Sequence, residues 1–269
     1  MIVIGERINA SNKSVGEAII KRDGAYITSL TQAQTEAGAD YIDVNTGIGQ
    51  YEYEQEIAAM KWLVTTVQAE TDKPLAIDSE RPEVIKAAME KYRGEELVIN
   101  SVTAEPEKLA AIGPLVAERG ARLVALAMGS DGVPNNIEKR LEACETIVTH
   151  LTRMGVKMEQ IFFDPLVIPV SVDSHQGLVI LKTIEGIKSR YPGARTVVGL
   201  SNISYGLPNR KLVNRSFLLM AAHAGLDAAI LDPLDTKIMS LVKVAEMLIG
   251  KDTLCRTYIR AHRRGIIAD

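Results

Sequence analysis

Residues 196–204, TVVGLSNIS, decide how the rest of the chain is interpreted. A run of β-branched and apolar residues is typical of a buried parallel strand, and here it ends abruptly in Gly199, Ser201 and Asn202. A carboxamide buried in an apolar strand costs free energy unless something pairs with it. We therefore interpret this stretch as a strand whose carboxyl end carries polar groups for binding a ligand.

The same pattern occurs throughout the chain. Further apolar runs are each followed by a loop and then by a segment in which apolar residues recur every three or four positions. These runs end at Asn45, Asp78, Asn100, Met128, Asp164 and Asp232. A short strand at residues 2–4, with Glu6 and Arg7 at or beyond its end, brings the strand–helix pairs to eight. Eight pairs in 269 residues predict an α/β fold, a (β/α)8 TIM barrel forming one domain over residues 1–269.

Some boundaries follow from the same patterns. The helical periodicity runs from residue 17 to residue 38 and predicts one helix closed by Gly38. The loop at residues 45–56 is long enough to overhang the mouth of the barrel. The basic segment RTYIRAHRRG, residues 256–265, follows the last expected helix, and we interpret it as a solvated, partly frayed terminus.

Composition argues against several classes of function. Hydrophobic residues make up 46% of the chain, while 4% aromatic residues and a net charge of -3 give no sign of a nucleic-acid-binding surface. From the opening residues we expect no signal peptide, and the sequence contains no apolar run of membrane-spanning length. Cys144 and Cys255 offer neither a zinc spacing nor a disulfide framework, and the four histidines lie away from the strand ends. We expect a cytoplasmic protein without a metal, a membrane or a nucleic acid as partner.

The side chains at the expected strand ends have a distinctive chemistry. They are carboxamides and carboxylates with no cation among them: Asn45, Asn100, Asn202, Asp78, Asp164 and Asp232. The last loops lack the glycines of a phosphate-binding turn, which argues against a phosphorylated substrate. A carboxylate accepts two parallel N–H bonds from an amino-pyrimidinone, and a carboxamide pairs with an adjacent donor and acceptor. The set indicates a flat heterocycle such as a pterin or a purine-like ring.

Simpler structural roles compete with ligand binding. Asp164 and Asp232 each precede a proline and could fix turns or cap helices, and Asn45 could begin a turn. Glu6 and Arg7 could form an ion pair that closes the first strand. The residues by themselves leave these alternatives open.

Seven short motifs occur in order along nearly the whole chain: IGERIN, IDVN, LAIDS, INS, FDPL, GLSNIS and NRSFL. Together they resemble the pterin-dependent methyltransferases, which move a methyl group between tetrahydrofolate and a corrinoid carried on a partner protein. The resemblance implies a TIM barrel that forms a homodimer, with tetrahydrofolate or methyltetrahydrofolate as substrate. No Asp-x-His-x-x-Gly string of a corrinoid-binding segment is present in the sequence, so cobalamin is expected on a separate corrinoid protein.

The resemblance also implies roles for particular residues. Hydrogen bonds to the pterin ring are expected from Asp78, Asn100 and Asp164. The floor beside the pterin N5 is expected to be Gly199, Ser201 and Asn202, with Arg210 and Ile230 near the folate. Asn202, placed to hydrogen-bond N5, is the expected catalytic residue. Tyr205 departs from the pattern, since folate-using members carry a glutamine there, and this leaves contacts beyond the pterin open.

Two alternative functions are compatible with the sequence. A dihydropteroate synthase would also read a pterin, but it should show Ser-Arg-Lys where this chain has Ser201-Asn202-Ile203. Its Arg-x-His string on the eighth strand is matched only by Arg260-Ala261-His262, which follow the last expected helix. A non-catalytic folate-binding subunit of a corrinoid complex is the second alternative. The direction of methyl transfer and the identity of the corrinoid partner are likewise open.

Overall fold

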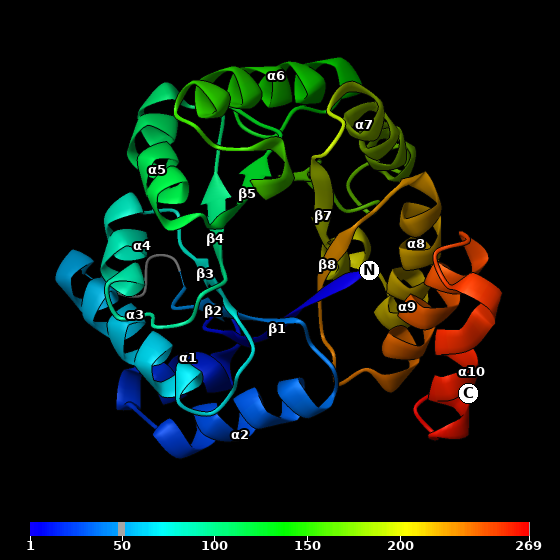
Figure 1. Cartoon of the computed structure of the whole chain (residues 1–269), viewed down its shortest axis with the longest axis horizontal. Helices are drawn as coiled ribbons and strands as arrows, with labels where there is room; N and C mark the ends of the chain where they lie inside the picture. The colour runs from blue at the N-terminus through cyan, green and yellow to red at the C-terminus, as the bar shows by residue number, and fades with distance from the viewer. Residues whose placement is uncertain (48–51, 269) are drawn as a thin grey trace.

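The computed structural model describes residues 1–47 and 52–268 and has the expected architecture. Eight parallel strands close into a barrel in chain order, and helices surround it (Figure 1). The strands are β1 (Ile2–Asn9), β2 (Tyr41–Asn45), β3 (Leu75–Asp78), β4 (Leu97–Val102), β5 (Arg122–Leu126), β6 (Ile161–Asp164), β7 (Arg195–Gly199) and β8 (Ala228–Leu231). The predicted (β/α)8 TIM barrel is therefore confirmed.

Helices form the outer layer of the barrel. The α-helices are α1 (Lys13–Lys21), α2 (Gly24–Glu36), α3 (Tyr53–Gln68), α4 (Pro82–Met89), α5 (Pro106–Arg119), α6 (Ile137–Arg153), α7 (Gln176–Arg190), α8 (Arg210–Ala224), α9 (Thr236–Leu248) and α10 (Arg256–Arg263). Short 3-10 helices are η1 (Met158–Gln160), η2 (Leu200–Ser204) and η3 (Thr253–Cys255). No helix in the described residues is long and apolar enough to cross a membrane.

Strand alternation decides which side chains enter the barrel. On β2, Ile42 and Val44 pack outward in the main core, while Tyr41 belongs to a separate cluster inside the barrel. The other fully buried members of that inner cluster are Ile4, Ala76, Val98, Val124, Phe162, Val197 and Ala228. Because side chains of a strand alternate between faces, the inward residue two positions further on lies nearer the carboxyl end. Those positions hold Glu6, Asp43, Asp78, Asn100, Leu126, Asp164, Gly199 and Ile230. The apolar layer thus supports a mostly polar layer at the mouth.

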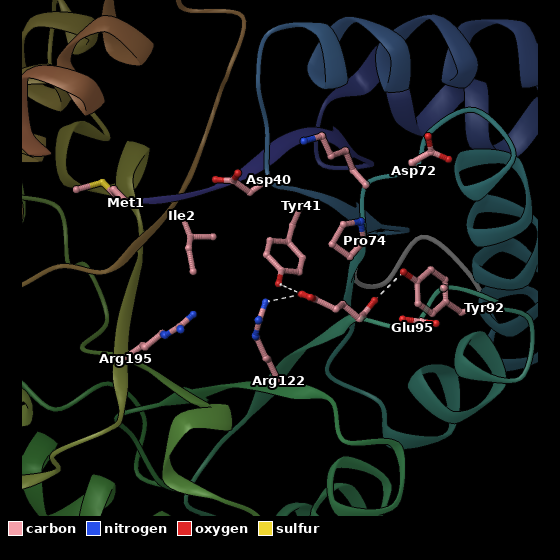
Figure 2. Close-up of a pocket in the computed structure, with 13 residues that line it drawn as sticks. Met1, Ile2, Asp40, Tyr41, Asp72, Pro74, Tyr92, Glu95, Arg122 and Arg195 are labelled. Carbon is pink, nitrogen blue, oxygen red and sulfur yellow. Dashed lines mark hydrogen bonds and ion pairs between the residues drawn. The ribbon is translucent and has the colours of Figure 1, made fainter. Parts of the chain in front are cut away.

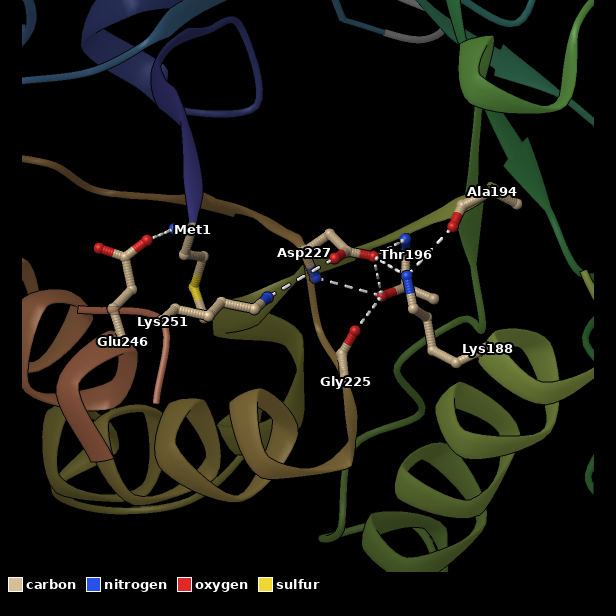
Figure 3. A network of polar contacts seen from close by, with 8 residues as sticks. All are labelled: Met1, Lys188, Ala194, Thr196, Gly225, Asp227, Glu246 and Lys251. Carbon is tan, nitrogen blue, oxygen red and sulfur yellow. Dashed lines mark hydrogen bonds and ion pairs between the residues drawn. The ribbon is translucent and has the colours of Figure 1, made fainter. Parts of the chain in front are cut away.

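The amino-terminal end of the barrel is held by a separate polar network (Figure 3). Asp227, just before β8, accepts hydrogen bonds from Lys188 Nζ at 2.7 Å and from the Thr196 backbone N at 3.0 Å. The amino group of Met1 pairs with Glu246 on α9. These contacts join β1, β7, α7 and α9 at the end opposite the mouth, where TIM barrels place residues for stability.

Two predicted boundaries are wrong because local capping was overlooked. The single helix expected over residues 17–38 is two helices, separated where Arg22 adopts a left-handed conformation and Asp23 accepts a hydrogen bond from the Tyr26 backbone N. The basic tail is not frayed: α10 begins where Asp252 accepts hydrogen bonds from the N–H groups of Thr257 and Tyr258, both at 2.9 Å. The expected overhanging loop at residues 45–56 lies partly outside the described residues.

The opening stretch also differs from its predicted form. β7 ends at Gly199, and the next five residues form η2 instead of continuing the strand. Asn202 is consequently exposed and not buried in a strand, so the argument from its burial was wrong. The turn moves the carboxamide out of the barrel wall and onto the mouth.

Candidate active site

One side of the mouth is a hydrogen-bonded group of carboxylates and carboxamides on β2, β3 and β4. The strands are in register, so that Asn45 pairs with Asp78 and Asp78 with Asn100. Asn45 Nδ2 donates to Asp78 Oδ2 at 2.6 Å, and Asn45 Oδ1 accepts from the Gly47 backbone N at 2.6 Å. Asn45 therefore forms the turn considered for it and also orients Asp78. The structure brings the predicted Asp78 and Asn100 together.

Asp43 is a member of this group that the sequence reasoning missed. It is 2% exposed and accepts a hydrogen bond from Asn100 Nδ2 at 3.4 Å. Alternation within YIDVN contained the signal, because Tyr41, Asp43 and Asn45 must share the inner face. Asp43 lies deeper in the barrel than Asn100 and binds its amide nitrogen, which leaves the amide oxygen of Asn100 for a ligand.

The surroundings of Asp43 and Asp78 disfavour the charged form of both carboxyl groups. Burial raises the pKa of Asp43 well above its ordinary value, and the charge of Asp78 raises it further. Burial also raises the pKa of Asp78 to about 6, although the hydrogen bond from Asn45 opposes the shift. Burial and mutual repulsion therefore both disfavour the state in which Asp43 and Asp78 are ionised together.

Asp164 lies at the end of β6, two residues before Leu166, whose backbone N donates to Asp164 Oδ1 at 2.7 Å. This bond matches the turn role considered for Asp164, and its other oxygen accepts no hydrogen bond from the described residues. Burial raises the pKa of Asp164 to about 6, and the charge of Arg140 opposes the shift. The cation that acts on this carboxyl, Arg140, lies on α6 and not at a strand end.

The other side of the mouth is built by η2 and the first turn of α8. A Cβ at Gly199 would lie 3.1 Å from Asn202 Nδ2, so glycine leaves room for that carboxamide. Arg210 donates from Nη2 to the Ser201 backbone O at 2.8 Å and from Nε to Ser204 Oγ at 3.0 Å. The predicted residues Gly199, Ser201, Asn202 and Arg210 thus form one local unit. Ile230 faces Gly199 in the β7–β8 register and packs inside the barrel.

Glu6, Arg7 and Asp232 complete this side. The ion pair considered as an alternative for Glu6 and Arg7 is absent from the described residues, because adjacent strand residues point to opposite faces and Arg7 Nη1 pairs instead with Asp232 Oδ2 at 3.3 Å. Asp232 Oδ1 also accepts from the Leu234 backbone N at 3.0 Å, which agrees with its predicted turn role. Burial, and then the charge of Asp232, raise the pKa of Glu6 to about 7, while Arg7, Arg210 and the Ser201 hydroxyl oppose the shift.

We expect the free energy of unfolding of the wild type to fall as the pH rises from 5 to 8, and we expect Glu6→Gln to show a smaller fall. The pKa of Glu6 rises from 4.5 to about 7 on folding, so the folded protein keeps a proton that the unfolded chain releases. This contribution is complete below pH 4.5 and is lost as the pH rises to about 7. The free energy of unfolding, measured with urea at pH 5 and at pH 8, should fall by about 1–2 kcal/mol more in wild type than in Glu6→Gln, after allowance for solvent screening. Parallel pH profiles would show that Glu6 titrates normally.

The mouth contains two hollows that match these two sides. One of about 250 Å³ is lined by Asn45, Asp78, Ser101 and Leu126, among others. The other, of about 280 Å³, is lined by residues that include Glu6, Ser201, Arg210 and Asp232. Polar groups that converge on hollows at the carboxyl ends of strands are the usual form of a TIM-barrel active site.

A larger cavity of about 720 Å³ opens at the opposite, amino-terminal face (Figure 2). There Arg122 Nη1 and the Tyr41 hydroxyl both donate to Glu96 Oε2, at 2.9 and 2.8 Å. None of the residues predicted to bind a ligand lines this cavity. Since this face of a TIM barrel serves stability, we place the active site at the mouth.

The fold and the site define a class of protein: a TIM barrel whose mouth carries aspartate and asparagine side chains at the ends of its strands. The pterin binding enzyme family matches residues 5–232, and the chain belongs to this family. It is 38% identical over 269 residues to the methylcorrinoid:tetrahydrofolate methyltransferase of Eubacterium limosum, covering 99% of this chain and 98% of that protein.

Two further proteins are similar at lower sequence identity, and one of them only over a part of its length. The chain is 32% identical over 259 residues to the methionine synthase of Mycobacterium tuberculosis, covering 91% of this chain but 21% of that protein. A dihydropteroate synthase of Xanthomonas albilineans in complex with 7,8-dihydropteroate has a TM-score of 0.67 at 18% identity, covering 91% of this chain and 92% of that chain. At that identity the structural likeness extends to the fold alone.

Proposed function

We propose that this protein is a cytoplasmic methyltransferase that moves a methyl group between N5 of tetrahydrofolate and the cobalt of a corrinoid carried on a separate protein. The observation that carries the proposal is the similarity, over 99% of the chain, to the methylcorrinoid:tetrahydrofolate methyltransferase of Eubacterium limosum. The mouth supports it, because it combines buried carboxylates with the exposed carboxamide of Asn202.

In this proposal the side of the mouth formed by β2 to β6 binds the pterin ring. Asp78 and Asp164 accept N–H groups of the ring, and the free oxygen of Asn100 accepts another. Their burial adds discrimination, because a ligand without matching donors would leave them unpaired. Arg210 and Ile230 lie beside the floor formed by Gly199, Ser201 and Asn202, where the rest of the folate would pass.

Asn202 is the proposed catalytic residue. When methyl leaves N5, the electron pair of the broken N–C bond stays on nitrogen, and a tertiary amine is a poor leaving group unless a proton or positive charge is supported there. A carboxamide N–H stabilises the developing electron pair without itself titrating, and the proton comes from solvent or a relay. In the reverse direction N5 must attack, and the same group would orient it.

Calorimetric titration with methyltetrahydrofolate, followed by addition of free cob(I)alamin, tests the function. We expect micromolar binding and slow methylation of cobalt, seen as a change in visible absorbance. The reverse reaction, from methylcobalamin to tetrahydrofolate, is run in parallel to assign the direction. Absence of binding would refute the folate assignment, while binding without transfer, even with a corrinoid protein, would favour the non-catalytic alternative. Dihydropteroate synthase activity is not favoured, because Arg260-Ala261-His262 lie on α10, outside the barrel.

We also propose that the protein forms a homodimer. Large apolar side chains are exposed on the neighbouring helices α7 and α8: Leu178 (56%), Leu212 (59%) and Met220 (51%). Exposed apolar surface of this kind commonly marks an association surface. Sedimentation equilibrium should give twice the chain mass of 29.3 kDa for wild type. A monomer at micromolar concentration would refute the proposal.

A further inference from the structure

A bulge in β1 sets the position of Glu6 at the mouth of the barrel. The paired residues on either side of it are Gly5 with Ile42 and Ile8 with Val44. Three steps along β1 thus match two steps along β2, and β1 carries one extra residue. On the other side, β8 pairs with β1 only as far as Gly5, so that strand stops before Glu6. Bulges beside functional sites commonly redirect a side chain, which makes Glu6 a candidate for a functional role.

A buried glutamine holds this bulge in place. Gln34, on α2, is 0% exposed, and its Oε1 accepts a hydrogen bond from the Arg7 backbone N at 3.0 Å. A Cβ at position 5 would lie 2.5 Å from the same oxygen, so Gly5 makes room for the amide. The residues before and after Glu6 are therefore both fitted to Gln34. The side chain of Arg7 is fixed as well, by its pairing with Asp232 at 3.3 Å.

Glu6 shares the hollow of about 280 Å³ with Ser201. It forms no ion pair in the part of the chain that the structure describes, and the two arginines around it are bonded elsewhere: Arg7 to Asp232, and Arg210 to the backbone O of Ser201. Burial, and then the charge of Asp232, raise the pKa of Glu6 to about 7. A carboxyl group that titrates near neutral pH can both give and accept a proton.

The charged side chains that surround Glu6 carry both signs. They are Arg7 on β1, Asp43 on β2, Asp232 after β8, Arg210 and Lys211 on α8, and Asp235 before α9. The 3-10 helix η2 contributes hydroxyl and carboxamide groups but no charge. Burial also raises the pKa of Asp43, so a pH dependence of the wild type has more than one candidate source. Variants of Glu6 itself are needed to assign it.

We propose that Glu6 and Ser201 form a proton relay for N5 of the folate, in which the Ser201 hydroxyl meets the substrate and Glu6 holds the exchangeable proton behind it. This inference rests on the proposed function. Ser201 precedes Asn202 on η2, so the relay lies next to the carboxamide that orients N5. The hollow gives Glu6 access to solvent, from which its proton is replaced.

The relay balances the methyl transfer in both directions. When the N5–C bond breaks, its electron pair stays on N5 and takes a proton from the Ser201 hydroxyl, which takes one from Glu6. Cobalt(I) supplies the electron pair of the new Co–C bond, and Glu6 is left as a carboxylate. In the reverse direction N5 attacks the methyl group, and Glu6 accepts through Ser201 the proton that N5 loses.

The test is the pH dependence of the single-turnover rate at saturating methyltetrahydrofolate with free cob(I)alamin, for wild type and Glu6→Gln. The wild-type rate should fall as the pH rises through about 7. Glu6→Gln should be about 100-fold slower at about pH 6 and within about threefold of wild type at about pH 9, where Glu6 has lost its proton. In the reverse reaction, from methylcobalamin to tetrahydrofolate, the wild-type rate should rise through the same pH.

Glu105→Gln is the matched control. Glu105 also follows a strand end, but it bonds Thr103 and Lys108 and lines neither hollow of the mouth. This variant should keep the wild-type pH profile, with rates within about twofold. Titration of the ligand is common to all three proteins.

Each outcome distinguishes the relay from the function on which it rests. If wild type transfers no methyl group, the proposed function fails and the relay fails with it. If wild type is active and Glu6→Gln keeps its pH profile, or loses the same factor at every pH, the relay alone fails. If circular dichroism shows Glu6→Gln to be unfolded, the pH profile of Asp232→Asn decides. Removing that negative charge should move the fall in rate about 0.5 pH units or more lower, and an unchanged profile would overturn the relay.

Discussion

Asn202→Ala is expected to lower the rate of methyl transfer from methyltetrahydrofolate to cob(I)alamin by about 100-fold or more. The Asn202 carboxamide is exposed on η2, where Gly199 leaves it room, and this variant removes its N–H without disturbing the core. If the hydrogen bond to N5 strengthens as the N–C bond breaks, truncation should reduce the chemical step much more than ground-state binding. Single-turnover measurement at saturating folate isolates that step.

A matched asparagine distinguishes catalysis from a general effect. Asn135 is also exposed, but it lies in the loop after β5, and its backbone O rather than its side chain holds Gln176. Asn135→Ala should therefore leave both folate affinity and single-turnover rate within about twofold of wild type, as is usual for surface substitutions. If Asn202→Ala instead weakens folate binding by the full factor and leaves the saturated rate unchanged, Asn202 is a binding residue and not a catalytic one.

The barrel and the polar mouth followed from sequence because both depend on short-range periodicity. Each strand carries an apolar residue followed two positions later by a mouth residue, as in Ala76 and Asp78 or Val98 and Asn100. The same rule would have found Asp43 had it been applied inside the strand as well as at its end. The break between α1 and α2 was also visible, since Asp23-Gly24 combines a helix cap with a flexible residue.

Other features depend on contacts between distant segments and could not be read locally. The burial of Arg140 is not visible in the helical pattern, and its side chain bonds Gln176, 36 residues away. The pairing of Arg7 with Asp232 spans 225 residues and needs the barrel to close. The change from strand to 3-10 helix after Gly199 is a tertiary effect, because the apolar Leu200 and Ile203 suit either form and are buried by packing near α8.

Asp78→Asn is expected to weaken methyltetrahydrofolate binding by about 100-fold, which corresponds to about 3 kcal/mol. An asparagine has the same shape but replaces one acceptor oxygen by a donor, so it can no longer accept two parallel N–H bonds from the ring. Its NH2 group must also face either Asn45 Nδ2, which now donates to Asp78 Oδ2 at 2.6 Å, or the N–H groups of the ring, and either orientation brings two donors together. Both effects act on the ligand-binding geometry, and calorimetry at pH 7.5, above the pKa of about 6 for Asp78, measures their sum.

Asp232→Asn is the control for that loss, because Asp232 is also a carboxylate at a strand end and at the mouth. Its oxygens already serve Arg7 and the Leu234 backbone N, so the chain itself and not a ligand accounts for them. The control should lower the unfolding midpoint slightly, through the weakened Arg7 ion pair, while folate affinity stays within about threefold of wild type. Equal losses of affinity in the two variants would mean that any change of a carboxylate at the mouth disturbs folate binding, and the specific recognition of the pterin by Asp78 would have to be abandoned. A loss confined to Asp78→Asn would instead locate recognition on the β2–β4 side, where Asn45 and Asp43 orient the groups that meet the ring.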